Sequence, residues 1–315
     1  MARVGVKIGG VKTSRVVAWG VAVTILSIGV AIRLNPSSLI LFSRDIKNRS
    51  PYCSTWKASL DGRIKLRQQS RSEEIFQASR LIHRDTDLSL WSTPKGQFWI
   101  PEGDSRILSL LLAQEERGIY GKEEWGVHGG DVVLDVGAYI GTWTRHALAR
   151  GAKVVVAIEP SPQSVECLKR NLAREVEAGK VVIYPKGIWD SEGALTLFGD
   201  SKTGVGNSFV EQNNSAQVMN AIPVTTIDKV VAELNLPRVD FIKADVKGAT
   251  ERLMHGGSGV IRRYSPRIAV STEEPVDNAG AIAALAHQIQ PAYQMMCGPC
   301  LLDSHEIYTD VLFFR

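Results

Sequence analysis

Cysteine is scarce in this sequence, with only four among its 315 residues, namely Cys53, Cys167, Cys297 and Cys300. So few cysteines argue against a small fold held together by disulfides. The sequence also lacks any group of histidines and cysteines with the spacing of a zinc site, and we therefore expect no metal.

Acidic residues are almost absent from the N-terminal arm. Residues 1–71 contain 13 Lys and Arg against only Asp45 and Asp61, whereas the remaining residues contain 24 basic and 31 acidic side chains. The basic excess therefore belongs to the arm, while the rest of the chain is acidic. Since nucleic-acid binding needs a basic globular surface, we expect no nucleic-acid partner.

Charge is missing altogether from Val16–Ile32, a nearly continuous apolar run between Arg15 and Arg33. Its length is within the range of a membrane-spanning helix. A signal peptide is the rival interpretation, but no small-x-small cleavage site follows. A buried globular helix is the other alternative. We favour an uncleaved, single-pass anchor. The basic residues continue to Arg71, which favours a cytoplasmic C-terminal domain.

A strand followed directly by a glycine turn is the strongest signal in the chain. Residues 132–136 read Val-Val-Leu-Asp-Val, a short apolar run typical of a strand buried on both faces. Gly137 follows, and a residue without a Cβ lets the backbone approach a ligand. A helix is expected from about Gly141, so its free N–H groups face the same point. Together with the Asp135 carboxylate, these features predict a nucleoside site.

The glycines of a dinucleotide fingerprint are absent. That fingerprint has the form G-x-G-x-x-G, and here Tyr139 and Thr142 stand where its second and third glycines are needed. A nicotinamide dehydrogenase is therefore the least favoured interpretation. A plain strand–turn–helix unit without a ligand is the bland alternative.

Residues 135–144, Asp-Val-Gly-Ala-Tyr-Ile-Gly-Thr-Trp-Thr, resemble the first motif of class I methyltransferases that depend on S-adenosyl-L-methionine (SAM), and of the FkbM type in particular. The resemblance implies a doubly wound, mostly parallel α/β sheet of the Rossmann-like kind and SAM as the cofactor. The residues expected to bind it are Asp135, Gly137, Ala138, Tyr139, Gly141, Glu159, Pro160 and Trp189.

Glu159 is the acid of this set. It ends the second apolar strand, Val154–Ile158, and lies 18 residues past Gly141. An acid at this point can accept hydrogen bonds from both ribose hydroxyls, although a helix-capping acid is the alternative. Trp189 follows the third strand, at a position that borders the adenine in the class I fold. A tryptophan of the core is equally compatible with that position.

A second motif, Lys243-Ala-Asp245-Val-Lys247-Gly-Ala, follows the strand that begins near residue 239. Lys243 and Asp245 are two apart, so we expect both at one side of the strand end, where parallel sheets bind ligands. A structural Lys–Asp pair is the alternative. The stretch resembles the FkbM pattern Lys-x-Asp-x-Glu-Gly-Ala, which implies catalytic roles for Lys243 and Asp245. Lys247 replaces the glutamate of that pattern and reverses a charge.

The remaining elements complete the expected domain. We predict a short helix near Glu73–Ile82, an aromatic hairpin over Leu88–Trp91 and Gln97–Ile100, a helix over Ser105–Arg117, and an antiparallel strand pair at the C-terminal end. The hairpin either caps the core or walls a substrate cleft. The expected domains are a tail and anchor at 1–34, a basic juxtamembrane linker at 35–87 and the methyltransferase domain at 88–315.

Cys297-Gly-Pro-Cys300 has the form of a thioredoxin active site, but only 15 residues follow it, too few for that fold. We interpret it as a turn between closing strands and expect Cys53 to be unpaired.

The motifs together predict a membrane-anchored, SAM-dependent enzyme that O-methylates a sugar, a glycan or a secondary metabolite. Two alternatives stay open. One is a membrane-tethered SAM-binding protein without catalysis, motivated by Lys247. The other, less favoured, is a thiol oxidoreductase that uses Cys297 and Cys300.

Overall fold

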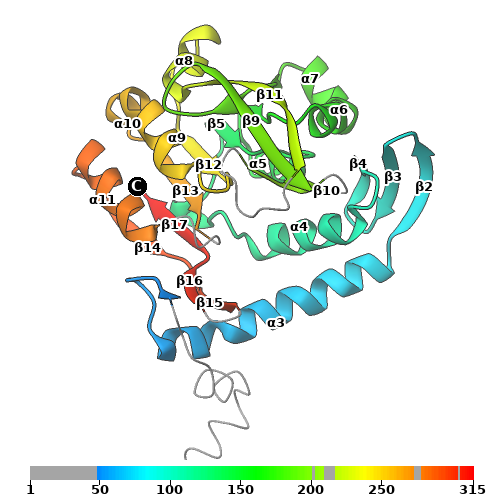
Figure 1. Cartoon of the computed structure of the whole chain (residues 1–315), viewed down its shortest axis with the longest axis horizontal. Coiled ribbons are helices and arrows are strands. Elements are labelled where there is room, and N and C mark those ends of the chain that lie inside the picture. Colours follow the sequence, from blue (N-terminus) through cyan, green and yellow to red (C-terminus); the bar gives the residue numbers. More distant parts are fainter. Residues whose placement is uncertain (1–47, 201–202, 209–216, 273–277, 304–305) are drawn as a thin grey trace, which may run out of the picture. The chain divides into compact units, whose positions relative to one another are not determined.

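Seven strands form the central sheet of the computed structural model, which describes residues 48–200, 203–208, 217–272, 278–303 and 306–315 (Figure 1). In order across the sheet they are β14 (Met295–Cys297), β17 (Val311–Phe314), β13 (Arg267–Ser271), β12 (Phe241–Ala244), β5 (Val132–Val136), β6 (Val154–Ile158) and β7 (Val181–Tyr184). Strand β17 runs antiparallel to both of its neighbours, and the pairs from β13 to β7 are parallel. The predicted mostly parallel α/β sheet is confirmed.

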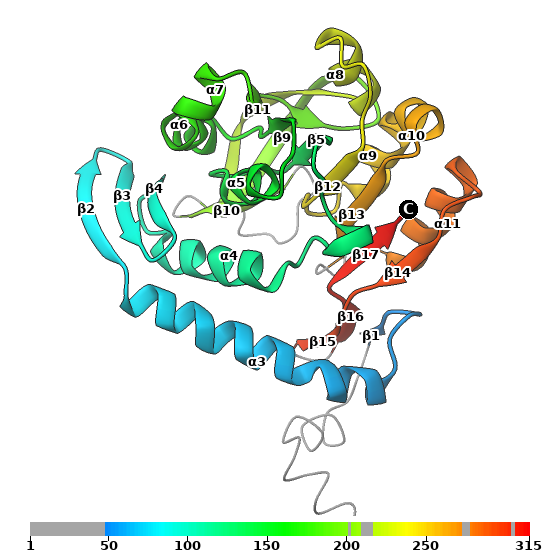
Figure 2. The ribbon, with the colours of Figure 1, turned by 180° about the vertical axis from the view of Figure 1, so that it is seen from behind.

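Helices cover both faces of this sheet, because successive residues of its buried strands point to opposite sides. On one face Val133 and Val155 pack with Trp143 of α5 (Thr142–Ala149). On the other face Leu134 and Val156 pack with four further helices. These are α8 (Ile227–Glu233), α9 (Thr250–Gly256), α10 (Ser258–Tyr264) and α11 (Ala279–Ile289). The sheet is therefore doubly wound, with the helix groups on its two sides visible in Figure 2.

Two further helices follow β6. They are α6 (Pro162–Asn171) and α7 (Ala173–Glu177). Leu168 of α6 and the adjoining Leu172 are fully buried, and they pack against Ala157 of β6. Helix α6 thus lies on the same face as α5.

The predicted linker contains one long helix and two strands where it is described. Helix α3 spans Thr55–Gln77, and the Ser54 hydroxyl caps it by accepting a hydrogen bond from the Lys57 N–H at 3.0 Å. The prediction of a short helix over Glu73–Ile82 was wrong. Its first residues belong to the long helix α3, which ends at Gln77, and the chain then enters strand β2 (Arg80–Asp85). The bounds of the three predicted domains stay a prediction.

The predicted aromatic hairpin is confirmed as β3 (Leu88–Thr93) and β4 (Gly96–Pro101), which form a three-stranded sheet with β2. Its Phe98 and Ile100 are buried against Leu108 of α4 (Ser105–Arg117), and Tyr139 packs against the same cluster. Helix α4 has the predicted bounds. The hairpin therefore covers part of the core beside the glycine turn.

A second sheet and a short 3₁₀ helix complete the domain. The sheet has the order β10-β9-β11-β8, and the 3₁₀ helix η1 spans Glu123–Trp125. The strands are β10 (Thr203–Ser208), β9 (Gly193–Asp200), β11 (Gln217–Thr225) and β8 (Gly187–Ile188). Strands β9 and β11 pair antiparallel.

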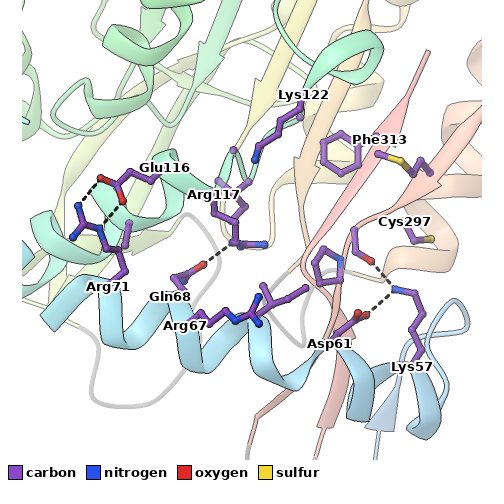
Figure 3. A pocket seen from close by; sticks show the side chains of 18 residues that line it. Lys57, Asp61, Arg67, Gln68, Arg71, Glu116, Arg117, Lys122, Cys297 and Phe313 are labelled. Carbon is purple, nitrogen blue, oxygen red and sulfur yellow. Dashed lines mark hydrogen bonds and ion pairs between the residues drawn. The ribbon is translucent and has the colours of Figure 1, made fainter. Parts of the chain in front are cut away.

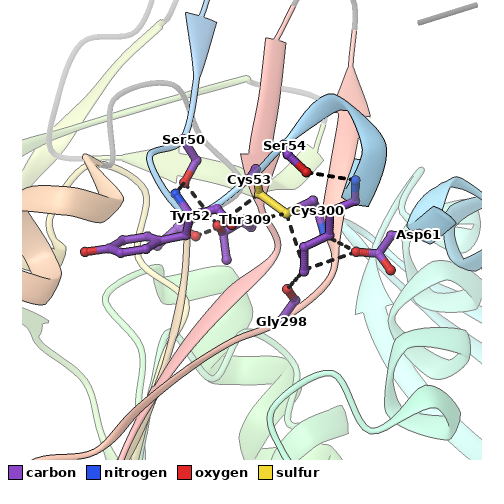
Figure 4. Close-up of a disulfide and its surroundings, with 10 residues drawn as sticks. Ser50, Tyr52, Cys53, Ser54, Asp61, Gly298, Cys300 and Thr309 are labelled. Atoms are coloured by element: carbon purple, nitrogen blue, oxygen red, sulfur yellow. Dashed lines mark hydrogen bonds and ion pairs between the residues drawn. A yellow bond between two sulfur atoms is a disulfide. The ribbon is translucent and has the colours of Figure 1, made fainter. Parts of the chain in front are cut away.

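The C-terminal end contains a small third sheet and a disulfide. Strands β15 (Cys300–Asp303) and β16 (Glu306–Thr309) pair antiparallel, and β1 (Asn48–Arg49) joins β16. A disulfide links Cys53, just before α3, to Cys300 (Figure 4). The expectation of an unpaired Cys53 was therefore wrong, because the fold brings two residues 247 positions apart to one point.

No described helix between residues 48 and 315 is long and apolar enough to cross a membrane. The predicted anchor, Val16–Ile32, lies outside the described residues and stays a prediction.

Candidate functional site

The glycine turn between β5 and α5 is built from left-handed backbone. Gly137, Tyr139 and Gly141 have φ angles of +76°, +50° and +87°. A Cβ placed on Gly137 would overlap the carbonyl oxygen of Asp245, and one on Gly141 would contact Leu172. The close approach that Gly137 permits is therefore to the chain leaving β12, whereas we expected it to be to the ligand. Ala138 is buried, and its N–H donates to the Ile158 carbonyl at 3.1 Å.

Glu159 meets this turn directly. Its carboxylate accepts hydrogen bonds from the backbone N–H of Tyr139 at 2.9 Å and of Ser161 at 3.0 Å. Burial raises the pKa of Glu159 to about 7, although both N–H groups favour its charged form. The partly buried Pro160 follows. The acid predicted to face a ribose therefore lies against the glycine turn and is poised to change charge near neutral pH.

Asp135 and Lys243 form a buried ion pair. They are register partners on the neighbouring strands β5 and β12, with the Lys243 Nζ 3.0 Å from the Asp135 Oδ1. The hydroxyl of Thr144 donates to the other Asp135 oxygen at 2.6 Å, and Lys243 donates to the Gly137 carbonyl at 2.7 Å. Burial lowers the pKa of Lys243, but the charges of Asp135, Asp245 and Glu115 and the hydrogen bond to Asp135 together outweigh it, and the net pKa is raised. The pair ties the turn to the sheet.

Asp245 lies beyond the end of β12 and is exposed, while Lys243 is only 3 % exposed. The Asp245 N–H donates to the Val136 carbonyl at 3.0 Å and holds the exit of β12 against β5. The strand ends at Ala244, but the Asp245 carboxylate still lies near enough to Lys243 to favour its charged form. The expectation that the two side chains share one side of the strand end stays a prediction. Asp245 presents its carboxylate to solvent at the carboxyl edge of the sheet.

Trp189 directly follows β8 and is partly buried. Its backbone N–H donates to the Thr225 carbonyl at 2.8 Å. The Arg252 guanidinium lies 5.6 Å from the centre of the indole ring. A cation over one face is typical of an aromatic ring on a surface. Lys247, the departure from the family pattern, is partly buried, and Gly248 after it has a φ of +68°.

Two acids near the turn were missed by the sequence reasoning. Asp104 is fully buried and accepts a short hydrogen bond from the hydroxyl of Tyr139. Glu115 of α4 lies close enough to Lys243 and Asp135 to feel both charges, and burial raises its pKa well above the usual range. No motif marks either residue. The only signals were the positions of the two acids, since Asp104 directly precedes α4 and Glu115 lies within this helix.

Glu115 is the less satisfied of these two acids. Its Oε2 has no hydrogen-bond partner among the described residues and lies 3.9 Å from the Nδ1 of His146. Burial lowers the pKa of His146, so its imidazole is neutral near pH 7. Glu115 therefore lies beside the Asp135–Lys243 pair with its pKa raised by burial.

Comparisons with known proteins agree with this geometry. A family model described as methyltransferase FkbM domain matches residues 135–290. The structure is similar to a methyltransferase FkbM from Methylobacillus flagellatus KT, with 15% identity, a TM-score of 0.46, and coverage of 81% of this chain and 60% of that one. This chain therefore spans well under two thirds of that protein.

Two other solved structures match at lower similarity. A precorrin-6y C5,15-methyltransferase from Geobacter metallireducens GS-15 is 12% identical, with a TM-score of 0.36 over 60% of this chain and 80% of that one. A Streptococcus mutans protein named a putative methyltransferase, solved in complex with SAH, is 9% identical, with a TM-score of 0.36 over 60% of this chain and 89% of that one. No curated protein matches the sequence.

Proposed function

We propose that this chain, whose residues 135–290 match a family model described as methyltransferase FkbM domain, moves a methyl group from SAM to a hydroxyl of a sugar, a glycan or a secondary metabolite. One observation carries the proposal. The carboxylate of Glu159 and the turn that begins at Gly137 meet at the carboxyl edge of a parallel sheet, where such sheets bind nucleosides.

The residues of this edge fit SAM. Glu159 offers acceptors for the ribose hydroxyls, and these are charge-assisted above its pKa of about 7. The backbone N–H groups at the start of α5 point to the same edge, with their dipole positive there. SAM supplies the electrophilic methyl group when bound. The Asp135–Lys243 pair acts behind it as a positioning pair, because its members are buried and engaged with each other.

Methyl transfer to a hydroxyl is an in-line displacement, so holding donor and acceptor in line supplies most of the rate. A base that takes the hydroxyl proton adds to this effect. Asp245 is the better base in this proposal, since it is exposed at the carboxyl edge. Lys243 is buried and protonated, which removes its ability to accept a proton.

A SAM-binding protein without catalysis is the second candidate, favoured by the charge reversal at Lys247. The two functions separate in one experiment. Calorimetry with SAM should give micromolar binding, about −8 kcal/mol. Release of S-adenosylhomocysteine is then measured over a panel of sugars and glycans. Turnover with any acceptor supports the enzyme, binding without turnover supports the second candidate, and no heat at millimolar SAM contradicts both.

The thiol oxidoreductase is no longer favoured. Cys300 is bonded to Cys53 rather than to Cys297, and burial raises the pKa of the Cys297 thiol. A redox-active thiol needs the opposite shift.

The membrane anchor at Val16–Ile32 also stays a proposal, supported by its uninterrupted apolar sequence. The full chain should stay in the membrane fraction through a carbonate wash. A variant with Val23→Lys and Leu26→Lys should be released, because charges at the centre of a span are costly. Recovery of the unaltered chain in the soluble fraction contradicts the anchor.

A further inference from the structure

A cavity of about 710 Å³ lies away from the glycine turn, between α3, the end of α4 and the turn that joins β14 to β15 (Figure 3). Its wall comes from three segments far apart in the sequence, which are 57–71, 113–122 and 296–299, with Phe313 of β17. The Cys53–Cys300 disulfide links the start of the first segment to the end of the third. The cavity is thus built by elements that the fold brings together beside these two cysteines.

The lining of the cavity is strongly basic. Five cations face two carboxylates there, and these are Lys57, Arg67, Arg71, Arg117 and Lys122 against Asp61 and Glu116. The charge of the lining side chains therefore favours an anion.

Three of the cations are held in place by acids. Lys57 lies 3.1 Å from Asp61, and Arg71 makes two hydrogen bonds to Glu116, at 2.7 and 3.0 Å. These bonds lower the pKa of Glu116 to about 2, so its charge is engaged. Arg117 lies 2.5 Å from the fully buried Asp310, which is outside the lining.

Two cations remain. Arg67 and Lys122 have no side-chain hydrogen bond or ion pair to any described residue, although they come from opposite walls. Figure 3 draws both side chains extending into the hollow from α3 and from the segment after α4. Guanidinium and ammonium groups placed in this way suit the oxygens of a phosphate group.

Apart from Gln68, Cys297 and three glycines, the rest of the lining is apolar. The apolar residues are Ile64, Ala113, Ile119, Met296, Pro299 and Phe313. Phe313 and Ile119 are themselves 5 % exposed and belong to the core, so this part of the wall is rigid. A small hydrophilic anion would leave it without contacts, whereas a ligand with an apolar body would cover it.

The cavity is a neighbour of the SAM site, not a part of it. The segment after α4 turns Ile119 toward the cavity, while the ring of the next residue, Tyr120, lies 5.3 Å from the Nζ of Lys243. We propose that this cavity binds a phosphate monoester of an apolar alcohol, with the phosphate between Arg67 and Lys122 and the apolar part on Phe313 and Ile64. The proposal is independent of methyl transfer.

Calorimetry on the full chain tests the proposal with dodecyl phosphate below its critical micelle concentration. Inorganic phosphate and dodecyl maltoside are the comparison probes, since each carries only half of the proposed chemistry. Dodecyl phosphate should bind at least tenfold more tightly than either. Equal binding of dodecyl maltoside, or no binding of dodecyl phosphate, overturns the proposal.

Variants locate the site. Arg67→Gln with Lys122→Gln should weaken dodecyl phosphate binding at least tenfold. The control, Arg63→Gln with Lys153→Gln, removes the same charge from exposed positions outside the lining. It should change the affinity for dodecyl phosphate less than twofold. Ile64→Trp fills the apolar part without altering charge and should also weaken binding. Equal losses in the Arg67/Lys122 variant and its control overturn the assignment.

Vesicles distinguish a lipid from a soluble ligand. Flotation with vesicles of phosphatidylcholine containing phosphatidic acid is compared for the chain that carries Val23→Lys and Leu26→Lys, with and without the Arg67/Lys122 substitutions. In this background the proposed anchor does not itself hold the chain on the vesicles. Vesicle binding that needs both cations identifies a lipid headgroup as the source, and binding of dodecyl phosphate alone identifies a soluble ester. Vesicle binding that survives in the variant, with no binding of dodecyl phosphate, overturns the proposal.

Discussion

The ammonium of Lys243 lies 3.0 Å from the carboxylate of Asp135, and both side chains are almost completely buried. The two residues sit side by side on β5 and β12, one residue from the last of each strand. Because Lys243 also donates to the Gly137 carbonyl, the pair holds the first residue of the glycine turn. Asp135 and Lys243, which come from the two motifs of the sequence analysis, are thus joined in one buried ion pair.

Replacement of Lys243 by Met should destabilise the protein by roughly 3–5 kcal/mol, since it leaves the Asp135 charge buried without its partner. Chemical denaturation measures the change. The matched control is Arg84→Met, which breaks an ion pair to Glu102 in which the side chains are 68 % and 45 % exposed. That change should cost less than about 1 kcal/mol.

The double variant with Asp135→Asn and Lys243→Met should recover part of the loss, because neither charge then remains buried. A double variant as unstable as the sum of the single variants would contradict the pairing. Equal effects of Lys243→Met and Arg84→Met would do the same.

Local signals made much of the fold predictable. The apolar run at 132–136 and the glycines after it act within a few residues, so they could be read without knowing the fold. The acid at Glu159 was found in the same way, because it ends an apolar strand. The structure brings it to the turn as expected, at 2.9 Å from the Tyr139 N–H.

Contacts between distant residues could not be predicted from the sequence. The disulfide joins Cys300 to the distant Cys53. In the sequence, Cys300 instead matched a C-x-x-C motif with its near neighbour Cys297. Helix α3 has few apolar residues, and only Ala58, Ser59 and Ile75 are buried. For that reason its polar sequence was interpreted as a linker. Its packing against α4 could not be predicted, because it depends on the rest of the fold.

SAM affinity should rise with pH through about 7. The raised pKa of Glu159 means that the carboxyl is mostly protonated below this value, and the ribose hydroxyls donate best to its charged form. Calorimetry between pH 6 and 8 measures the effect. In Glu159→Gln affinity should fall by about 1.5–3 kcal/mol, and the part of the pH dependence due to this acid should vanish. Parallel pH profiles for the parent and Glu159→Gln would refute the role.

Gly137→Val should prevent correct folding of the turn. Gly137 has a φ of +76°, and any Cβ there would overlap the carbonyl oxygen of Asp245. We expect a lower melting temperature together with loss of SAM binding. Gly129→Ala is the control, because a Cβ at Gly129 meets no atom within 4 Å. A Gly137→Val protein that melts and binds like the Gly129→Ala protein would show that the turn has another conformation.

Loss of the disulfide should lower the free energy of unfolding by roughly 2–5 kcal/mol, because it closes a very long loop in the unfolded chain. The test is Cys53→Ser with Cys300→Ser, compared in denaturation experiments with the parent. Cys297→Ser removes a free thiol three residues from the same bond and should change stability far less. If the parent is equally stable with and without reductant, the bond does not contribute to stability.

The same bond tests the side of the membrane. SAM is made and kept in the cytoplasm, so we expect the domain to face it, as the basic run to Arg71 also favours. Disulfides are rare in that compartment, and Cys53 and Cys300 should then be recovered as thiols from cells quenched in acid and alkylated at once. Their side chains already lie together in the fold, so the bond should form when the purified protein is exposed to an oxidant. A C-terminal reporter that fluoresces only in the cytoplasm should be bright. A dark reporter, together with a Cys53–Cys300 linked peptide from quenched cells, would place the domain in an oxidising compartment without its methyl donor, and would count against the methyltransferase proposal as well as the topology.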